Sequence, residues 1–224
     1  MQISNIQFDR SKNIEFYKTV QKRVRGYFKE NNISRYGNAA MVVKTVFMIS
    51  LYVIPYVFLL TVVNSVAISF LMWFLMSLGM AGVGLSIMHD ANHGAYSKNK
   101  NVNKFLGGLV GAAGVSDAMW RIQHNVLHHT YTNVTGMDTD IDPGNILRFS
   151  PHEKRRSFHK YQHIYAWFLY GLMTLSWITS KDFTQIYKYK EMGLTQTQTN
   201  SVNKLLFRMI LNKALYYGIV LVLP

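Results

Sequence analysis

The chain contains no cysteine among its 224 residues. It therefore cannot form a disulfide bond, and it cannot hold a thiolate zinc site or an iron–sulfur cluster with residues of its own. Any metal ion that this chain binds must be held by nitrogen or oxygen atoms.

Acidic residues are scarce: 11 aspartates and glutamates stand against 24 lysines and arginines, which gives a net charge of +13. Nine basic residues lie in residues 1–44, nine lie in residues 89–163, and none lies between Thr45 and Lys98. Basic segments on both sides of an uncharged stretch are typical of segments that stay on the cytoplasmic side of a membrane. We therefore expect both segments to face the cytoplasm and expect no nucleic-acid partner; a phosphate-binding patch is the weaker alternative.

Charge is almost absent from residues 41–88, where Lys44 is the only charged residue. Two apolar runs, 41–63 and 66–87, are separated by an Asn-Ser pair. A helix of about 22 residues, at about 1.5 Å per residue, matches a hydrocarbon core of about 30 Å. The pattern predicts a transmembrane hairpin. The alternative, two helices that are apolar on every side, requires the core of a much larger soluble protein.

Outside the hairpin, the apolar stretches are shorter or incomplete. Residues 14–28 carry apolar residues at helical spacing beside lysines and arginines, which favours a helix in an anionic headgroup layer. Two further apolar stretches, 105–115 and 164–178, are short for a membrane span. We expect residues 105–115 to form a helix that packs closely on its neighbours or lies at the membrane interface. We expect residues 164–178 to form an interfacial or re-entrant segment. Residues 209–224 end while still apolar, which predicts an unfinished span in a truncated chain.

The sequence thus predicts an all-α, multi-span integral membrane protein that consists of one incomplete domain. Its expected parts are a basic amphipathic N-terminal segment (1–40), a transmembrane hairpin (41–88), a cytoplasmic histidine-rich region (89–163), an interfacial or re-entrant segment with a basic loop (164–208) and the start of a further transmembrane helix (209–224).

Five of the eight histidines fall into two clusters, MHDANH with His89 and His93 and QHNVLHH with His124, His128 and His129. Residues four apart lie on one face of an α-helix, so each cluster can direct two imidazoles at one ion. His129 lies about 100° further round such a helix than His128 and can address a second ion or a bridging position. One such pair is often only an amphipathic feature of a membrane interface, but two clusters together predict a site for two metal ions.

The residues around the clusters narrow the kind of metal site. Zinc proteases need a glutamate between the paired histidines, whereas this chain has Asp90, Ala91 and Asn92 there. Soluble di-iron bundles use glutamate bridges, and no glutamate occurs between Glu30 and Glu153. Imidazole suits zinc, copper, iron and nickel alike. What remains is a histidine-rich site for a metal that does redox work in an apolar setting.

The segments MHDANHGAYS and MWRIQHNVLHHTYTN resemble the first two histidine boxes of the membrane fatty acid desaturases, in particular the front-end, delta-6-like acyl-CoA and acyl-lipid desaturases. The resemblance covers essentially the whole chain. It implies an oxidoreductase with two non-haem iron ions, which uses O2 and two external electrons to introduce a double bond into an acyl-CoA or acyl-lipid chain. On the matching positions it implies five iron ligands: His89, His93, His124, His128 and His129.

The same resemblance implies no catalytic residue beyond the metal ligands. Asp90 and Asn125 lie inside the two boxes, where they are candidates for orienting the ligating imidazoles. The family's haem-binding His-Pro-Gly-Gly, which marks a cytochrome b5 fusion, is absent from this sequence. We therefore expect a separate electron donor, a ferredoxin or a cytochrome b5-type protein, to dock on the basic cytoplasmic face.

The sequence departs from the family pattern in one respect. The family has a third box of the type Gln-x-x-His-His, which neither His152 nor the pair His159 and His163 reproduces. We expect His159 and His163 to be interface anchors and the 224-residue chain alone to be inactive. The expected location is a bacterial inner membrane, with the histidine boxes on the cytoplasmic side. Two alternatives stay open, namely a membrane di-iron hydroxylase or ketolase with similar boxes and a non-catalytic metal-binding remnant.

Two further groups of residues invite a functional interpretation. Asp138, Asp140 and Asp142 lack the glycine and the distal glutamate of an EF-hand, so we expect a solvated loop there. Three aromatic residues are expected near the proposed metal site: Trp120, Tyr131 and Tyr165. They could line a tunnel for the acyl chain, but we favour an aromatic belt at the membrane interface. The membrane lipid bilayer and the acyl substrate are the remaining expected partners.

Overall fold

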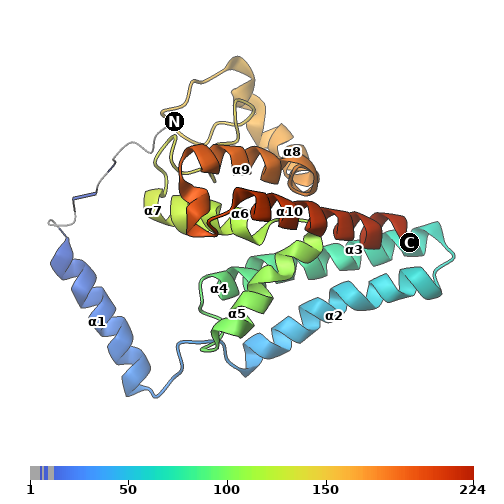
Figure 1. Ribbon diagram of the computed structural model, residues 1–224, viewed down its shortest axis with the longest axis horizontal. Helices are drawn as coiled ribbons and strands as arrows, with labels where there is room; N and C mark the ends of the chain where they lie inside the picture. Colours follow the sequence, from blue (N-terminus) through green and yellow to red (C-terminus); the bar gives the residue numbers. More distant parts are fainter. Residues whose placement is uncertain (1–5, 7, 10–12) are drawn as a thin grey trace. The chain divides into compact units, whose positions relative to one another are not determined.

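The computed structural model describes residues 6, 8, 9 and 13–224, and each regular element among them is a helix (Figure 1). The predicted all-α fold is confirmed. Residues 1–5, 7 and 10–12, which belong to the expected N-terminal segment, lie outside the described residues. Two compact units can be distinguished, residues 3–107 and residues 108–224.

The unit of residues 3–107 is built around a pair of long apolar helices. Its elements are α1 (Ile14–Glu30), α2 (Ala39–Thr61), α3 (Val66–Gly82), the π-helix η1 (Val83–Met88), α4 (His89–Asn92) and α5 (Lys100–Gly107). The side chain of Asn38 caps α2 by accepting a hydrogen bond from the backbone N–H of Met41 at 3.0 Å. Helices α2 and α3 lie side by side (Figure 1), and they cover most of the two apolar runs from which the hairpin was predicted.

The close approach of α2 and α3 depends on a glycine. A Cβ atom at Gly79 of α3 would lie 2.7 Å from the backbone nitrogen of Tyr52 and 2.8 Å from the backbone oxygen of Met48, both in α2. Backbone atoms of a helix cannot move aside to relieve such a clash, whereas the end of a flexible side chain can. Small residues at such contacts are typical of helix pairs in membranes, because they let two backbones pack closely.

We therefore expect Gly79→Ala to destabilise the unit by about 1–3 kcal/mol through overpacking, even though alanine favours helix. Gly84→Ala, in the same continuous helix, is the matched control because a Cβ atom there meets nothing within 4 Å. Thermal unfolding of both variants in detergent would measure the difference. Equal unfolding temperatures for the two variants would contradict the proposed packing.

The unit of residues 108–224 is made of shorter helices, several of which change type along their length. In chain order the elements are η2 (Gly108–Ala113), α6 (Asp117–Arg121), η3 (Ile122–His128), α7 (His129–Tyr131), η4 (Ser157–Tyr161), α8 (Gln162–Ser176), η5 (Trp177–Lys181), α9 (Asp182–Glu191), η6 (Leu194–Thr197), α10 (Val202–Tyr217) and η7 (Gly218–Val222). Of these, η3, η5 and η7 are π-helices, whereas η2, η4 and η6 are 3₁₀-helices. Its core comprises fully buried side chains of α6, η3, α9 and α10: Met119, Ile122, Leu127, Ile186, Tyr189, Leu205 and Met209.

Three helices in the described residues are long and apolar enough to cross a membrane, namely Ala39–Thr61, Val66–Asn92 and Val202–Val222. Most of their apolar side chains are exposed, as they would be toward lipid acyl chains. The apolar run predicted from residue 209 lies inside a helix that already begins at Val202. The stretch 164–178 lies in α8 and η5 and is not among the three, so its interfacial or re-entrant position stays a prediction.

A buried ion pair joins three segments of the second unit. Lys213 of α10 lies 3.0 Å from the carboxylate of Asp182, and the two residues are only 5% and 3% exposed. The Lys213 ammonium also donates to the backbone oxygens of Gly114, Trp177 and Ile178, so it binds carbonyl groups of the π-helix η5. Burial raises the pKa of Asp182, and the attraction of Lys213 opposes that shift.

Candidate metal centre

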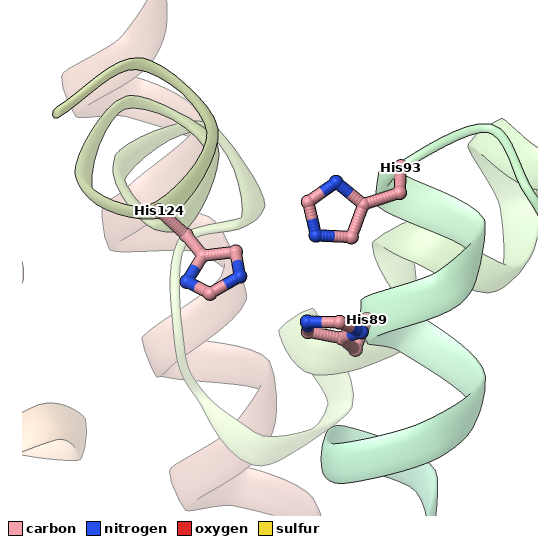
Figure 2. Close-up of side chains that lie close together, drawn as sticks. All are labelled: His89, His93 and His124. Atoms are coloured by element: carbon pink, nitrogen blue, oxygen red, sulfur yellow. The ribbon is translucent and has the colours of Figure 1, made fainter. Parts of the chain in front are cut away.

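His89 and His93 lie where the second apolar helix ends. The chain runs without a break from α3 through η1 into α4, which begins at His89, and His93 follows as its C-terminal cap. The backbone N–H of His93 donates to the oxygen of His89 at 3.1 Å, so this short segment has the α-helical spacing that the sequence predicted. Figure 2 shows both imidazoles on the same side of the helix, and their centroids are 4.6 Å apart.

Asp90 lies beside the first of these rings. Its Oδ1 atom is 3.1 Å from Nδ1 of His89, both side chains being partly exposed. A carboxylate at Nδ1 would leave Nε2 of His89 to bind a metal. Asn125, the other residue expected to orient an imidazole, lies partly buried in η3 of the second unit. The orienting roles of both residues stay predictions.

The second cluster is not the regular α-helix that the sequence led us to expect. Residues 122–128 form the π-helix η3, in which the backbone N–H of His129 donates to the oxygen of His124, five residues earlier. The wider turn brings residue i+5, and not only residue i+4, next to residue i. The sequence, which placed His129 about 100° from His128 on an α-helix, did not indicate that His129 would lie next to His124.

The π-helix brings the imidazoles of His128 and His129 next to that of His124, which Figure 2 draws on its helical segment. Nε2 of His129 lies 3.2 Å from Nε2 of His124, and the rings of His124 and His128 are stacked with centroids 5.3 Å apart. Two nitrogens that bind one metal at about 2.1 Å each are separated by roughly 3 Å. The distance between the His124 and His129 nitrogens is thus what a shared ion requires.

Two carboxylates on the loop after α7 complete this cluster. Asp138 is fully buried, and both its oxygens lie 3.1 Å from Nδ1 of His128. Asp140 places an oxygen 3.4 Å from Nδ1 of His128 and 3.6 Å from Nδ1 of His124. The solvated loop predicted for these aspartates is wrong for Asp138, because the loop folds back on η3 there. Asp140 and Asp142 remain exposed to solvent, and Asp142 pairs with Lys188 at 3.7 Å.

The charge of Asp138 is stabilised although the residue is buried. Burial by itself would raise the pKa of this carboxyl, but the backbone N–H groups of Asn133 and Asp140 and the imidazole of His128 outweigh it, and the pKa lies below its usual value. Asn133 has a positive φ of 63°, which asparagine tolerates better than most residues, and this bend aims its N–H at Asp138. Sequence spacing alone carried no signal for this contact.

An apolar cavity of about 600 Å³ adjoins the second cluster within the same unit. Its walls combine Trp120, His124 and Asp140 with apolar residues of α8: Leu169, Leu172 and Met173. The Trp120 ring stacks on the His124 ring with centroids 4.6 Å apart, and the interfacial belt favoured for Trp120 stays a prediction. Cavities of this size and composition bind small ligands. A ligand in this cavity would contact the imidazole of His124.

The remaining histidines lie apart from the candidate metal ligands. His159 is buried, accepts a hydrogen bond from the backbone N–H of Arg156 at Nδ1 and donates from Nε2 to the oxygen of Asn145 at 3.1 Å. The interface anchor expected at His159 is therefore wrong, because both ring nitrogens stabilise the loop before α8. His152 and His163 are exposed.

The donor set of the second cluster suits a divalent metal. Ligand atoms of His124, His128 and Asp140 lie within 4.8 Å of one another, and imidazole with carboxylate is the chemistry that non-haem iron accepts. In the unit of residues 3–107, His89 and His93 form a pair of imidazoles of their own, with centroids 4.6 Å apart. Iron at these residues would supply the capacity to activate O2 against an unactivated C–H bond.

Comparison with known proteins relates the chain to fatty acid desaturases. The model of the fatty acid desaturase family matches residues 65–224. The chain is 36% identical over 177 residues to an sn-1 linoleoyl-lipid 6-desaturase of Arthrospira platensis, with 79% of this chain and 48% of that protein covered. It is 36% identical over 183 residues to an acyl-lipid (8-3)-desaturase of Physcomitrium patens, with 80% and 38% covered.

A third relative, an sn-1 linoleoyl-lipid 6-desaturase of Synechocystis, is 32% identical over 162 residues, with 72% of this chain and 45% of that protein covered. The chain thus spans less than half the length of each of these relatives. No solved structure is significantly similar to it. Because the family model matches most of the chain and includes both histidine clusters, this protein belongs to the fatty acid desaturase family.

Proposed function

We propose that this protein takes part in the O2-dependent desaturation of an acyl chain carried by a membrane lipid, with two non-haem iron ions held by His89, His93, His124, His128 and His129. The single observation that carries the proposal is the pair of Nε2 atoms of His124 and His129, 3.2 Å apart beside an apolar cavity. An acyl lipid is favoured over acyl-CoA because the relatives described above are named for lipid-linked substrates.

The residues of the chain have separate tasks in this proposal. The imidazoles hold the metal, while the carboxylates of Asp138 and Asp140 lie at the Nδ1 side of the rings of the second cluster. The apolar wall from α8, together with Trp120, would hold a hydrocarbon chain and exclude water from the reacting carbon. The proposed membrane helices would keep this region at the surface from which an acyl chain rises.

The proposal includes an orientation and an electron donor. The basic residues flanking the first two spans favour the cytoplasmic side for both histidine clusters. Lys154, Arg155 and Arg156 are exposed and precede α8, so they offer positive charge to an acidic carrier. A ferredoxin or a cytochrome b5-type protein fits that description.

The 224-residue chain alone is predicted to be inactive. We expect expression of the reading frame that contains this chain, in a host that lacks the activity, to produce a new double bond in the acyl chains of the host lipids. Gas chromatography with mass spectrometry of the fatty acids would measure it, with His124→Ala as the inactive control. A hydroxylated product would show a hydroxylase instead. The absence of a new product from the full-frame, iron-loaded protein that is supplied with an electron donor would contradict the proposal.

A further inference from the structure

Asp138 is the most completely buried acidic group beside the candidate metal ligands. It is 0% exposed, whereas Asp140 in the same loop keeps 27% of its side chain exposed. Its two oxygens are equally distant, at 3.1 Å, from Nδ1 of His128. A carboxylate in this position needs a compensating donor, because burying it without one is costly.

The backbone holds the Asp138 carboxylate in one orientation. Oδ2 accepts the N–H of Asn133 at 2.9 Å, and Oδ1 accepts the N–H of Asp140 at 3.0 Å. Each oxygen therefore accepts one backbone hydrogen bond, and both oxygens face the same Nδ1 atom of His128. These two backbone hydrogen bonds hold the side chain in this orientation.

This arrangement selects one tautomer of His128. A neutral imidazole carries its proton on one nitrogen and offers a lone pair on the other. An ionised carboxylate only accepts hydrogen bonds, so the His128 nitrogen that faces Asp138 must be the one that carries the proton. The lone pair is then at Nε2, on the opposite side of the ring.

We propose that Asp138 is a positioning residue of the metal centre, which holds the proton of His128 on Nδ1 and thereby makes Nε2 the metal-binding atom. The inference rests on the proposed function, since it assigns a task within the same site. Carboxylate partners of this kind fix the orientation of a ligating histidine and increase its basicity.

A competing arrangement would place a cation at Nδ1 of His124, Nδ1 of His128 and an oxygen of Asp140, all of which lie near one another. It would require Nδ1 of His128 to present a lone pair to both oxygens of Asp138 at 3.1 Å. Two acceptors that face each other without a proton repel. The geometry therefore favours the proton at Nδ1, with Asp140 outside the set of proposed ligands.

Nitrogen-15 NMR of histidine-labelled, metal-free protein tests the tautomer directly, with the His128 signal assigned by its loss in His128→Gln. We expect the Nδ1–H form in the wild-type protein and a shift toward the Nε2–H form in Asp138→Asn, whose amide can donate to the ring. Asp142→Asn is the matched control, because Asp142 is exposed and its oxygens are paired with Lys188 and the N–H of Gly144. An Nε2–H form in the wild-type protein overturns the inference.

Iron titration gives a second readout. Asp138→Asn should weaken iron binding by about 10- to 100-fold, as losses of such partners do, while Asp142→Asn should bind iron as the wild-type protein does. If the wild-type protein binds iron and Asp138→Asn binds it equally well, the inference is wrong but the proposed function stands. If the wild-type protein binds no iron, the proposed function fails, and the role of Asp138 fails with it.

Discussion

Replacing His124 with alanine is expected to lower both the iron affinity of the protein and the yield of desaturated product by more than about 100-fold, beyond the loss typical of an orienting residue. Its Nε2 atom lies 3.2 Å from Nε2 of His129, its ring stacks on Trp120, and its side chain lines the apolar cavity. The substitution would remove one metal ligand and enlarge the cavity that faces the substrate.

The same reasoning predicts that His129→Ala is as damaging as His124→Ala, because the π-helix η3 makes these two residues the pair with facing Nε2 atoms. Iron content by mass spectrometry and fatty acid analysis of the same preparations would measure both effects. His152→Ala is the control, since His152 is exposed and lies outside both clusters. Full iron content in either variant would refute the shared ion.

Lys213→Met is expected to destabilise the unit of residues 108–224 by about 3–5 kcal/mol, the cost of leaving a buried charge without its partner. The substitution removes the ammonium group from Asp182 and from the backbone oxygens of Gly114, Trp177 and Ile178. Methionine has a similar length, so little apolar packing is lost. Chemical or thermal unfolding in detergent would measure the loss.

Two further variants separate charge from packing. Lys204→Met removes an exposed lysine of the same helix and should change stability little, because exposed charges contribute little. Adding Asp182→Leu to Lys213→Met removes the unpaired carboxylate, and we expect it to recover part of the loss. If the double variant were less stable than Lys213→Met alone, the buried charge would not be the cause.

The effect of Lys213→Met should depend on pH. Burial raises the pKa of Asp182, and Lys213 opposes this shift, so the variant should have an even higher pKa at Asp182. The folded variant then binds more protons than the unfolded chain at pH values above the usual pKa of aspartate, about 3.9. Its stability must therefore fall as pH rises through that range. A destabilisation that stays constant from acid to neutral pH would contradict this account.

Some elements could be predicted because local pattern decides them. The apolar runs that contain α2 and α3 were evident because a membrane span needs uninterrupted apolar length, whatever the helix packs against. The family could be recognised because histidine spacing and flanking residues lie within short segments. The start of α10 at Val202 was missed because Lys204, Arg208 and Lys213 interrupt its apolar pattern, and Lys213 turned out to be buried against Asp182.

The sequence by itself determined that this chain is helical, that it carries long apolar helices and that its histidines have desaturase spacing, since each of these properties depends on neighbours along the chain. Only the tertiary structure decided that η3 is a π-helix, that His124 faces His129 and that Asp138 is buried behind His128. The contact between Asp138 and His128 depends on the loop after α7 folding back on η3. Such a contact is set by packing and by backbone hydrogen bonds, and residue spacing does not encode it.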